Sequence, residues 1–132
     1  MAPPSGKVFV TYTPQADGRA DPGEVVWTWV AYEDDPTQGK DRPVLIIGAR
    51  SGWLAGLMLT SKDRADDRPN QYLDIGTGSW DRLRRPSEVR LDRLIDIDPA
   101  RVRREGCALA PELFRRVVAA ASQHLPELRL PG

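Results

Sequence analysis

The chain has 132 residues, which is enough for one domain with a hydrophobic core and too few for two. Its 19 basic and 19 acidic residues balance, so no overall charge attracts nucleic acid or a membrane surface. One cysteine and one histidine argue against an internal disulfide, a metal site or a metal cofactor, and no run approaches the roughly 20 apolar residues of a membrane helix.

The chain is predicted to divide into an extension, one domain and a tail. Residues 1–21 are rich in Pro, Gly and Ala and are expected to form a partly ordered N-terminal extension with one short apolar alternation. Residues 22–126 form the predicted domain, and residues 127–132 the tail. The N-terminus lacks a signal-peptide pattern and the lone Cys107 suits a reducing compartment, so we expect a cytoplasmic protein without a cofactor.

Four or five segments of the domain have the composition of short β-strands. The first is dense in β-branched and aromatic residues and follows the turn sequence Pro22-Gly23. The second is the continuously apolar run after Pro43, which is typical of a fully buried strand. The last alternates apolar and polar residues and is expected to be half-buried. The predicted strands cover residues 24–32, 43–49, 53–60, 71–75 and 87–98.

Local signals complete the predicted architecture. Gly56 inside a strand indicates a bulge or a close backbone approach. Asp98 before Pro99 predicts a capped helical turn, and apolar residues recur at helical spacing over residues 111–124. Short strands followed by one C-terminal helix indicate a mostly β domain, for which a small SH3-like antiparallel β-barrel fits best.

Two groups of side chains are candidates for chemistry on a phosphodiester. Lys40 and Arg42 are expected in the loop before Pro43, where a rigid strand would hold them in place to bind an anion. Arg90 and Asp92 are two residues apart on a predicted strand, so both point to one face. There the carboxylate can accept a proton from a ribose 2′-hydroxyl and the guanidinium can stabilise the phosphate, without a metal. By spacing alone, an ordinary ion pair on the solvent-facing side of a strand is the more common explanation of such a pair.

The tryptophans and the cysteine have less specific interpretations. Trp27 and Trp29 share one face of a predicted strand, so at least one of them is expected in the core. Trp53 and Trp80 lie at predicted turns, where an exposed ring can stack on an RNA base or simply cover the end of the barrel. Cys107 is expected to be buried and inert.

Three separated motifs resemble the PemK/MazF family of toxins from bacterial type II toxin–antitoxin systems. The first extends from Pro22-Gly23-Glu24-Val25-Val26-Trp27 to Gly39-Lys40-Asp41-Arg42-Pro43-Val44-Leu45-Ile46. The second is Leu59-Thr60-Ser61-Lys62, and the third is Val89-Arg90-Leu91-Asp92. The resemblance implies a small, usually dimeric β-barrel that cleaves single-stranded RNA at short sequences and is blocked by a cognate antitoxin protein.

The resemblance also implies roles for individual residues. Asp92 is expected to act as general base, with Arg90 and Arg42 stabilising the phosphate. The residues expected to be catalytic are Arg42, Thr60, Arg90 and Asp92. The residues expected to bind RNA are Lys40, Ser61, Lys62, Trp80 and Arg93.

Some features depart from the family pattern and keep other functions open. The extension through Asp21 and the segment 75–81 are not part of the common pattern, and the early histidine that some members use is absent. One alternative is a non-catalytic SH3-like barrel that binds nucleic acid or a protein. Another is a degenerate toxin that retains only its contact with an antitoxin.

Overall fold

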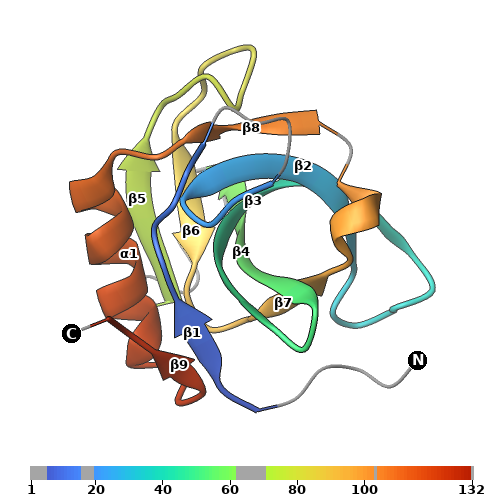
Figure 1. Cartoon of the computed structure of the whole chain (residues 1–132). Helices are drawn as coiled ribbons and strands as arrows, with labels where there is room; N and C mark the ends of the chain where they lie inside the picture. Colours follow the sequence, from blue (N-terminus) through green and yellow to red (C-terminus); the bar gives the residue numbers. More distant parts are fainter. Residues whose placement is uncertain (1–5, 16–19, 62–70, 103, 132) are drawn as a thin grey trace.

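The computed structural model describes residues 6–15, 20–61, 71–102 and 104–131. Figure 1 shows a strongly curled sheet with one α-helix, α1 (Pro111–Ser122), against its outer side. Within the described residues the sheet has nine strands. They are β1 (Val8–Val10), β2 (Glu24–Ala31), β3 (Gly39–Arg50), β4 (Trp53–Ser61), β5 (Tyr72–Gly76), β6 (Ser87–Arg90), β7 (Ile95–Ile97), β8 (Arg104–Ala108) and β9 (Leu128–Arg129).

The sheet order explains the curled shape. β5, β6, β4, β3, β1 and β9 follow one another, while β2 pairs with β3 and β8, and β7 pairs with β4. All pairs are antiparallel except β1 with β9. The prediction of a mostly β, SH3-like antiparallel barrel with a C-terminal helix is therefore confirmed.

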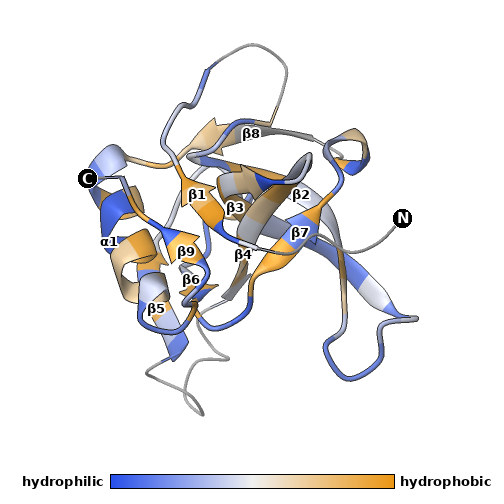
Figure 2. Ribbon diagram, turned by 60° about the horizontal axis from the view of Figure 1, so that its bottom comes forward, coloured by the Kyte–Doolittle hydropathy of each residue, from blue (hydrophilic) through white to orange (hydrophobic). Residues whose placement is uncertain are grey.

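The two faces of the curled sheet bury two different clusters. Strand side chains alternate, so Val25 and Leu45 point to one face and Val26 and Val44 to the other. The first face packs against α1, whose buried residues are Phe114, Val117, Val118 and Ala121. The second face holds a smaller cluster of Val26, Val30, Val44, Ile46, Met58 and Ile97 inside the curl. Figure 2 shows hydrophobic colour along much of the strands and hydrophilic colour in the connecting loops.

Two strand boundaries differ from the predictions. The second strand begins at Gly39 rather than at Pro43, because the ladder with β2 continues from Val25 opposite Leu45 to Ala31 opposite Gly39. Lys40 and Arg42 therefore lie in β3 and not in a loop. Gly39 permits this hairpin, since a Cβ there would lie 2.4 Å from the Val30 carbonyl oxygen.

The single strand predicted over residues 87–98 is wrong. A continuous ladder from Val89 opposite Leu59 would put Asp92 opposite Gly56, but Ile95 occupies that position. Three extra residues are thus accommodated between β6 and β7, and the chain bends there. This bend lifts Asp92 and Arg93 out of the regular ladder, so strand alternation does not decide where they point.

Other segments also differ from the sequence-based expectations. Within the extension, Val8 and Val10 are buried and β1 pairs with β3, so this segment is part of the sheet. β9 lies in the predicted tail, parallel to β1, and β8 was not predicted. The helix is confirmed, although it ends at Ser122, and Asp98 accepts a hydrogen bond from Ala100 N as expected for its cap.

Gly56 confirms the predicted close backbone approach. The register of β3 against β4 shifts between Ile46 and Gly48, and a Cβ at Gly56 would lie 2.5 Å from Val44 Cγ1 and 2.9 Å from the Leu45 carbonyl oxygen. We expect Gly56→Ala to lower the free energy of unfolding by about 1–3 kcal/mol, because the backbone oxygen cannot move without distorting the ladder. Urea denaturation measures this as a lower midpoint with an unchanged slope. An unchanged midpoint would show that the strands separate easily here.

Candidate active site

Arg42, Thr60 and Arg90 lie on one face of the sheet, the face inside the curl. Arg42 is opposite Thr28 in the β2–β3 ladder, and Thr60 is opposite Glu88 in the β4–β6 ladder. Arg90 follows Glu88 by two residues and therefore shares its face. Three strands that are distant in sequence thus bring together three of the four residues predicted to be catalytic.

Two hollows meet at this group, and Arg42 and Thr60 line both of them. The smaller, of about 180 Å³, is lined by Ala31, Tyr32, Glu33, Asp34, Arg42, Met58, Thr60, Tyr72, Arg90 and Arg93. The larger, of about 370 Å³, is lined by Trp27, Lys40, Asp41, Arg42, Pro43, Leu59, Thr60, Ser61, Trp80, Asp81, Arg85 and Ser87. Lys40 and Ser61 thus lie beside the predicted catalytic group. Lys62 lies outside the described residues.

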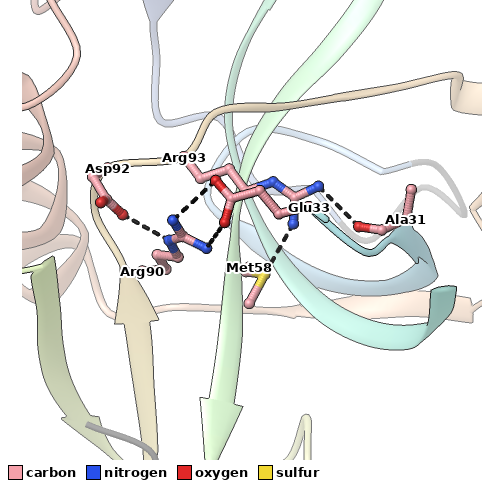
Figure 3. Close-up of polar contacts among 6 residues, drawn as sticks. All are labelled: Ala31, Glu33, Met58, Arg90, Asp92 and Arg93. Atoms are coloured by element: carbon pink, nitrogen blue, oxygen red, sulfur yellow. Dashed lines mark hydrogen bonds and ion pairs between the residues drawn. The ribbon is translucent and has the colours of Figure 1, made fainter. Parts of the chain in front are cut away.

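Arg90 is the centre of an ion-pair network (Figure 3). It is buried, and its Nε donates to Asp92 Oδ1 over 2.7 Å. Its Nη1 and Nη2 donate to the two carboxylate oxygens of Glu33, over 2.8 and 3.2 Å. The predicted Arg90–Asp92 pair is present, but Asp92 belongs to the bend after β6 and not to the strand face.

Glu33 is a member of the site that sequence reasoning missed. It directly follows the predicted strand over residues 24–32, and the only signal in the sequence is the run of three acids at residues 33–35. The hydrogen bond from Arg90 holds the pKa of the Glu33 carboxyl below its usual value. Burial alone would lower the pKa of Arg90, but the hydrogen bonds to Glu33 and Asp92 outweigh it and raise that pKa. Arg90 is therefore permanently charged. The Glu33 carboxylate binds it in the same bidentate manner in which an arginine binds a phosphate.

The Glu33–Arg90 pair predicts an acid-sensitive part of the stability. Because the folded pKa of Glu33 lies below the usual value of 4.5, the pair stabilises the fold above that pH and is lost as the pH falls through the lower folded value. We expect wild type to exceed Glu33→Gln in unfolding free energy at neutral pH, and this difference to shrink toward about pH 3. Urea denaturation of both proteins at the two pH values measures it. A constant difference would mean that the charge of Glu33 contributes nothing.

Arg93 connects the bend to the strand β2. Its Nη2 donates to the Ala31 carbonyl oxygen over 2.8 Å, and its Nη1 approaches Met58 Sδ at 3.9 Å (Figure 3). Arg93 lines the smaller hollow beside Arg90. This position is compatible with the predicted contact between Arg93 and RNA, although Nη2 already donates to the Ala31 carbonyl oxygen.

The aromatic residues differ from their predicted places. Trp80 is only 8% exposed and its Nε1 donates to Ser87 Oγ, so a base-stacking role that needs an exposed ring does not fit it. Trp27 is half-buried, and its Nε1 donates a hydrogen bond to the Trp80 carbonyl oxygen. Trp29 is 49% exposed, so neither tryptophan is a core residue. Loop packing around residues 78–87, which periodicity does not report, buries Trp80 instead. Cys107 is only partly buried.

Within the described residues, no group of three or more His, Cys, Asp or Glu side chains gathers where a metal ion could be held. None of the helices among these residues is long and apolar enough to cross a membrane.

The fold and the site define a class: a small curled β-barrel with arginine, carboxylate and hydroxyl groups on its inner face. Residues 21–125 match the family described as PemK-like, MazF-like toxin of type II toxin–antitoxin system, and the chain belongs to this family. A solved structure, the MazE–MazF crystal structure (Form-II) from Deinococcus radiodurans, matches with a TM-score of 0.57 and 21% sequence identity. That match covers 83% of this chain and 98% of the other, and it shows the shared fold. A search of curated proteins finds no match.

Proposed function

We propose that this protein is a metal-independent endoribonuclease, the toxin of a type II toxin–antitoxin pair, that cleaves single-stranded RNA such as mRNA at short sequences. The observation that carries the proposal is the convergence of Arg42, Thr60 and Arg90 on one face, with Asp92 hydrogen-bonded to Arg90 at 2.7 Å. The family membership supports the toxin assignment.

The proposed reaction assigns one role to each charged group. Asp92 accepts the proton of the ribose 2′-hydroxyl, whose oxygen then attacks the adjacent phosphorus atom. Arg90 and Arg42 stabilise the charge on the phosphate oxygens, and the raised pKa of Arg90 suits this role better than proton donation. The bond from phosphorus to the 5′-oxygen breaks, and that oxygen takes a proton from solvent. The products are a 2′,3′-cyclic phosphate and a 5′-hydroxyl.

The hydroxyl and cationic residues around this group would position the RNA. Thr60 lies between the two hollows, and Ser61 and Lys40 line the larger one. In the proposed complex, the phosphate takes the place of the Glu33 carboxylate on Arg90. Cleavage of mRNA would stop translation and growth.

The partners follow from the same assignment. The MazE–MazF structure supports a cognate antitoxin protein as the inhibitor of this chain. We propose that the protein acts as a homodimer in the cytoplasm. Size-exclusion chromatography with light scattering of the purified protein measures its oligomeric state.

The decisive test is cleavage of a long, unstructured single-stranded RNA by the purified protein in EDTA. Discrete fragments ending in cyclic phosphate are the expected result, together with a recognition sequence common to the cut sites. Substituting 2′-deoxynucleotides at a mapped cut site should abolish that cut, because the nucleophile is removed. Uncut RNA, across several sequences and with folded protein, would contradict the proposal.

One observation favours a second candidate, a barrel that binds without cleaving. In the structure, Glu33 and Asp92 occupy the Nε, Nη1 and Nη2 atoms of Arg90. If RNA cannot displace Glu33, the protein would retain only its contacts with a partner. RNA binding that depends on salt, without any cleavage products, would identify this function.

A further inference from the structure

The larger of the two hollows at the candidate site, of about 370 Å³, lies where β3 and β4 part. The ladder between these strands ends at Val44 opposite Met58, and beyond it β3 continues beside β2 whereas β4 continues beside β6. Pro43 suits this end of the ladder, because proline has no backbone N–H to donate to a neighbouring strand. The lining includes consecutive residues of both strands, 40–43 and 59–61, so the hollow opens between the strands rather than on one face.

The loop between β5 and β6 forms one wall of this hollow. Trp80 anchors the loop, because it is buried, its Nε1 donates to Ser87 Oγ over 3.0 Å, and its carbonyl oxygen accepts from Trp27 Nε1 over 2.9 Å. Gly78 makes this packing possible, since a Cβ there would collide with the Trp80 ring. The glycine-rich segment at residues 76–81, which lies outside the common family pattern, therefore builds a fixed wall.

Asp81 orients the side chain of Arg85 in this wall. Its Oδ1 accepts from the Leu83 N–H over 2.9 Å, and its Oδ2 accepts from Arg85 Nε over 2.8 Å. Burial alone would raise the pKa of the Asp81 carboxyl, but these hydrogen bonds outweigh it and lower that pKa. Arg85 is 60% exposed, and within the described part of the chain its Nη1 and Nη2 have no protein partner. The guanidinium thus keeps two parallel donors for a ligand.

The lining favours a base over a second phosphate. Asp41 and Asp81 both contribute carboxylates to this hollow, and they would repel a phosphate. Trp27 and Pro43 contribute apolar surface, which suits the faces of a planar base. Two parallel N–H groups of an arginine bind O6 and N7 of guanine bidentately, whereas adenine presents an amino donor in place of O6. The hollow therefore fits guanine best.

We propose that this hollow binds a guanine base of the RNA beside the phosphate at Arg42, with O6 and N7 of the base accepting from Nη1 and Nη2 of Arg85. Arg42 and Thr60 line the same hollow, so a nucleotide held there lies next to residues of the proposed cleavage site. The proposal rests on the proposed function for this placement, whereas the binding itself does not require cleavage. Arg85 determines the preferred sequence and does not touch the reacting atoms.

Fluorescence anisotropy with RNA that cannot be cut tests the proposal. The probes are uridine heptamers with one central guanosine, adenosine or 7-deazaguanosine, which lacks N7, and with 2′-fluoro groups in place of all 2′-hydroxyls. Wild type is expected to bind the guanosine probe about tenfold more tightly than either of the other two. Arg85→Ala is expected to bind all three equally. Arg82→Ala is the matched control and should keep the preference, because Arg82 is an exposed arginine of the same loop that does not line the hollow.

Arg85→Lys separates charge from geometry. It keeps the positive charge but loses the bidentate fork, so it should lose most of the preference for guanosine. If Arg85→Ala weakens the binding of all three probes by the same factor, Arg85 binds a phosphate and the guanine assignment is overturned. Equal wild-type affinities for guanosine and adenosine, or no binding of any probe, would overturn it as well.

Mapping the cut sites distinguishes this proposal from the proposed function. Cleavage that requires a guanosine in wild type, and no longer requires it in Arg85→Ala, supports both. A preference for guanosine in binding, without any cleavage, supports the base pocket and contradicts the nuclease. Cleavage at sequences without guanosine, at the same sites in Arg85→Ala, supports the nuclease and overturns the pocket.

Discussion

Asp92→Asn is expected to lower the rate of RNA cleavage by about 100- to 10,000-fold while RNA binding remains, because an amide cannot accept the proton of the 2′-hydroxyl. The side chain lies in the bend after β6 and is 20% exposed, so the substitution leaves the core intact. Asparagine can also still accept the hydrogen bond from Arg90 Nε. Single-turnover cleavage of a mapped RNA, with anisotropy for binding, measures both quantities.

Glu112→Gln is a suitable control for this experiment. It makes the same change from carboxylate to amide in the exposed first turn of α1, on the side of the sheet away from the inner face. Wild-type cleavage is expected. If Asp92→Asn also cleaves at the wild-type rate, Asp92 is not the general base, and Glu33 becomes the nearest carboxylate to examine.

Glu33→Gln is expected to tighten RNA binding about tenfold, because the phosphate no longer competes with a carboxylate for Arg90. The wild-type protein binds RNA only in the fraction of molecules in which Glu33 has left Arg90, and this fraction lowers its apparent affinity. The glutamine side chain has nearly the same size but no charge, so the turn that follows β2 should persist. Fluorescence anisotropy measures the change with a short RNA whose 2′-hydroxyls are all replaced by 2′-fluoro groups, so that the RNA can bind without being cut.

Asp34→Asn is the matched control for Glu33→Gln. It removes the same charge from the neighbouring residue, which lines the same hollow, whereas Arg90 forms its ion pairs with Glu33 and Asp92. A gain in affinity specific to Glu33→Gln supports competition for Arg90, whereas equal gains indicate only a less acidic surface. Weaker RNA binding in Glu33→Gln would contradict the prediction and show that Glu33 holds Arg90 in position for the substrate.

Much of the fold could be predicted because it depends on local patterns. The apolar run after Pro43 and the helical spacing over residues 111–124 each report a buried face, and both elements are present. β1, β8 and β9 were not predicted. They are short or lack strong periodicity, and their pairing partners, not their composition, make them strands.

The candidate site could be predicted only in part. The family motifs pointed to Arg42, Thr60 and Arg90, and strand alternation puts all three on one face, although Arg42 was expected in a loop and lies in β3. The placement of Asp92 by the same rule was wrong, because three extra residues interrupt the ladder before β7. The sequence left open whether Trp80 is exposed or covers the end of the barrel, and its burial was decided by packing within the loop that follows β5.

By itself, the sequence determined the kinds of chemical groups and the elements that carry them: a buried strand after an arginine, a strand with two hydroxyls, and an Arg-x-Asp pair. Only the tertiary structure decided which of these groups meet. The curl of the sheet brings β3, β4 and β6 together, and the turn after β2 places Glu33 on Arg90. The physical reason is that hydrophobic periodicity reports which face of an element is buried, whereas contacts between distant side chains depend on sheet register and on bends that the pattern does not contain.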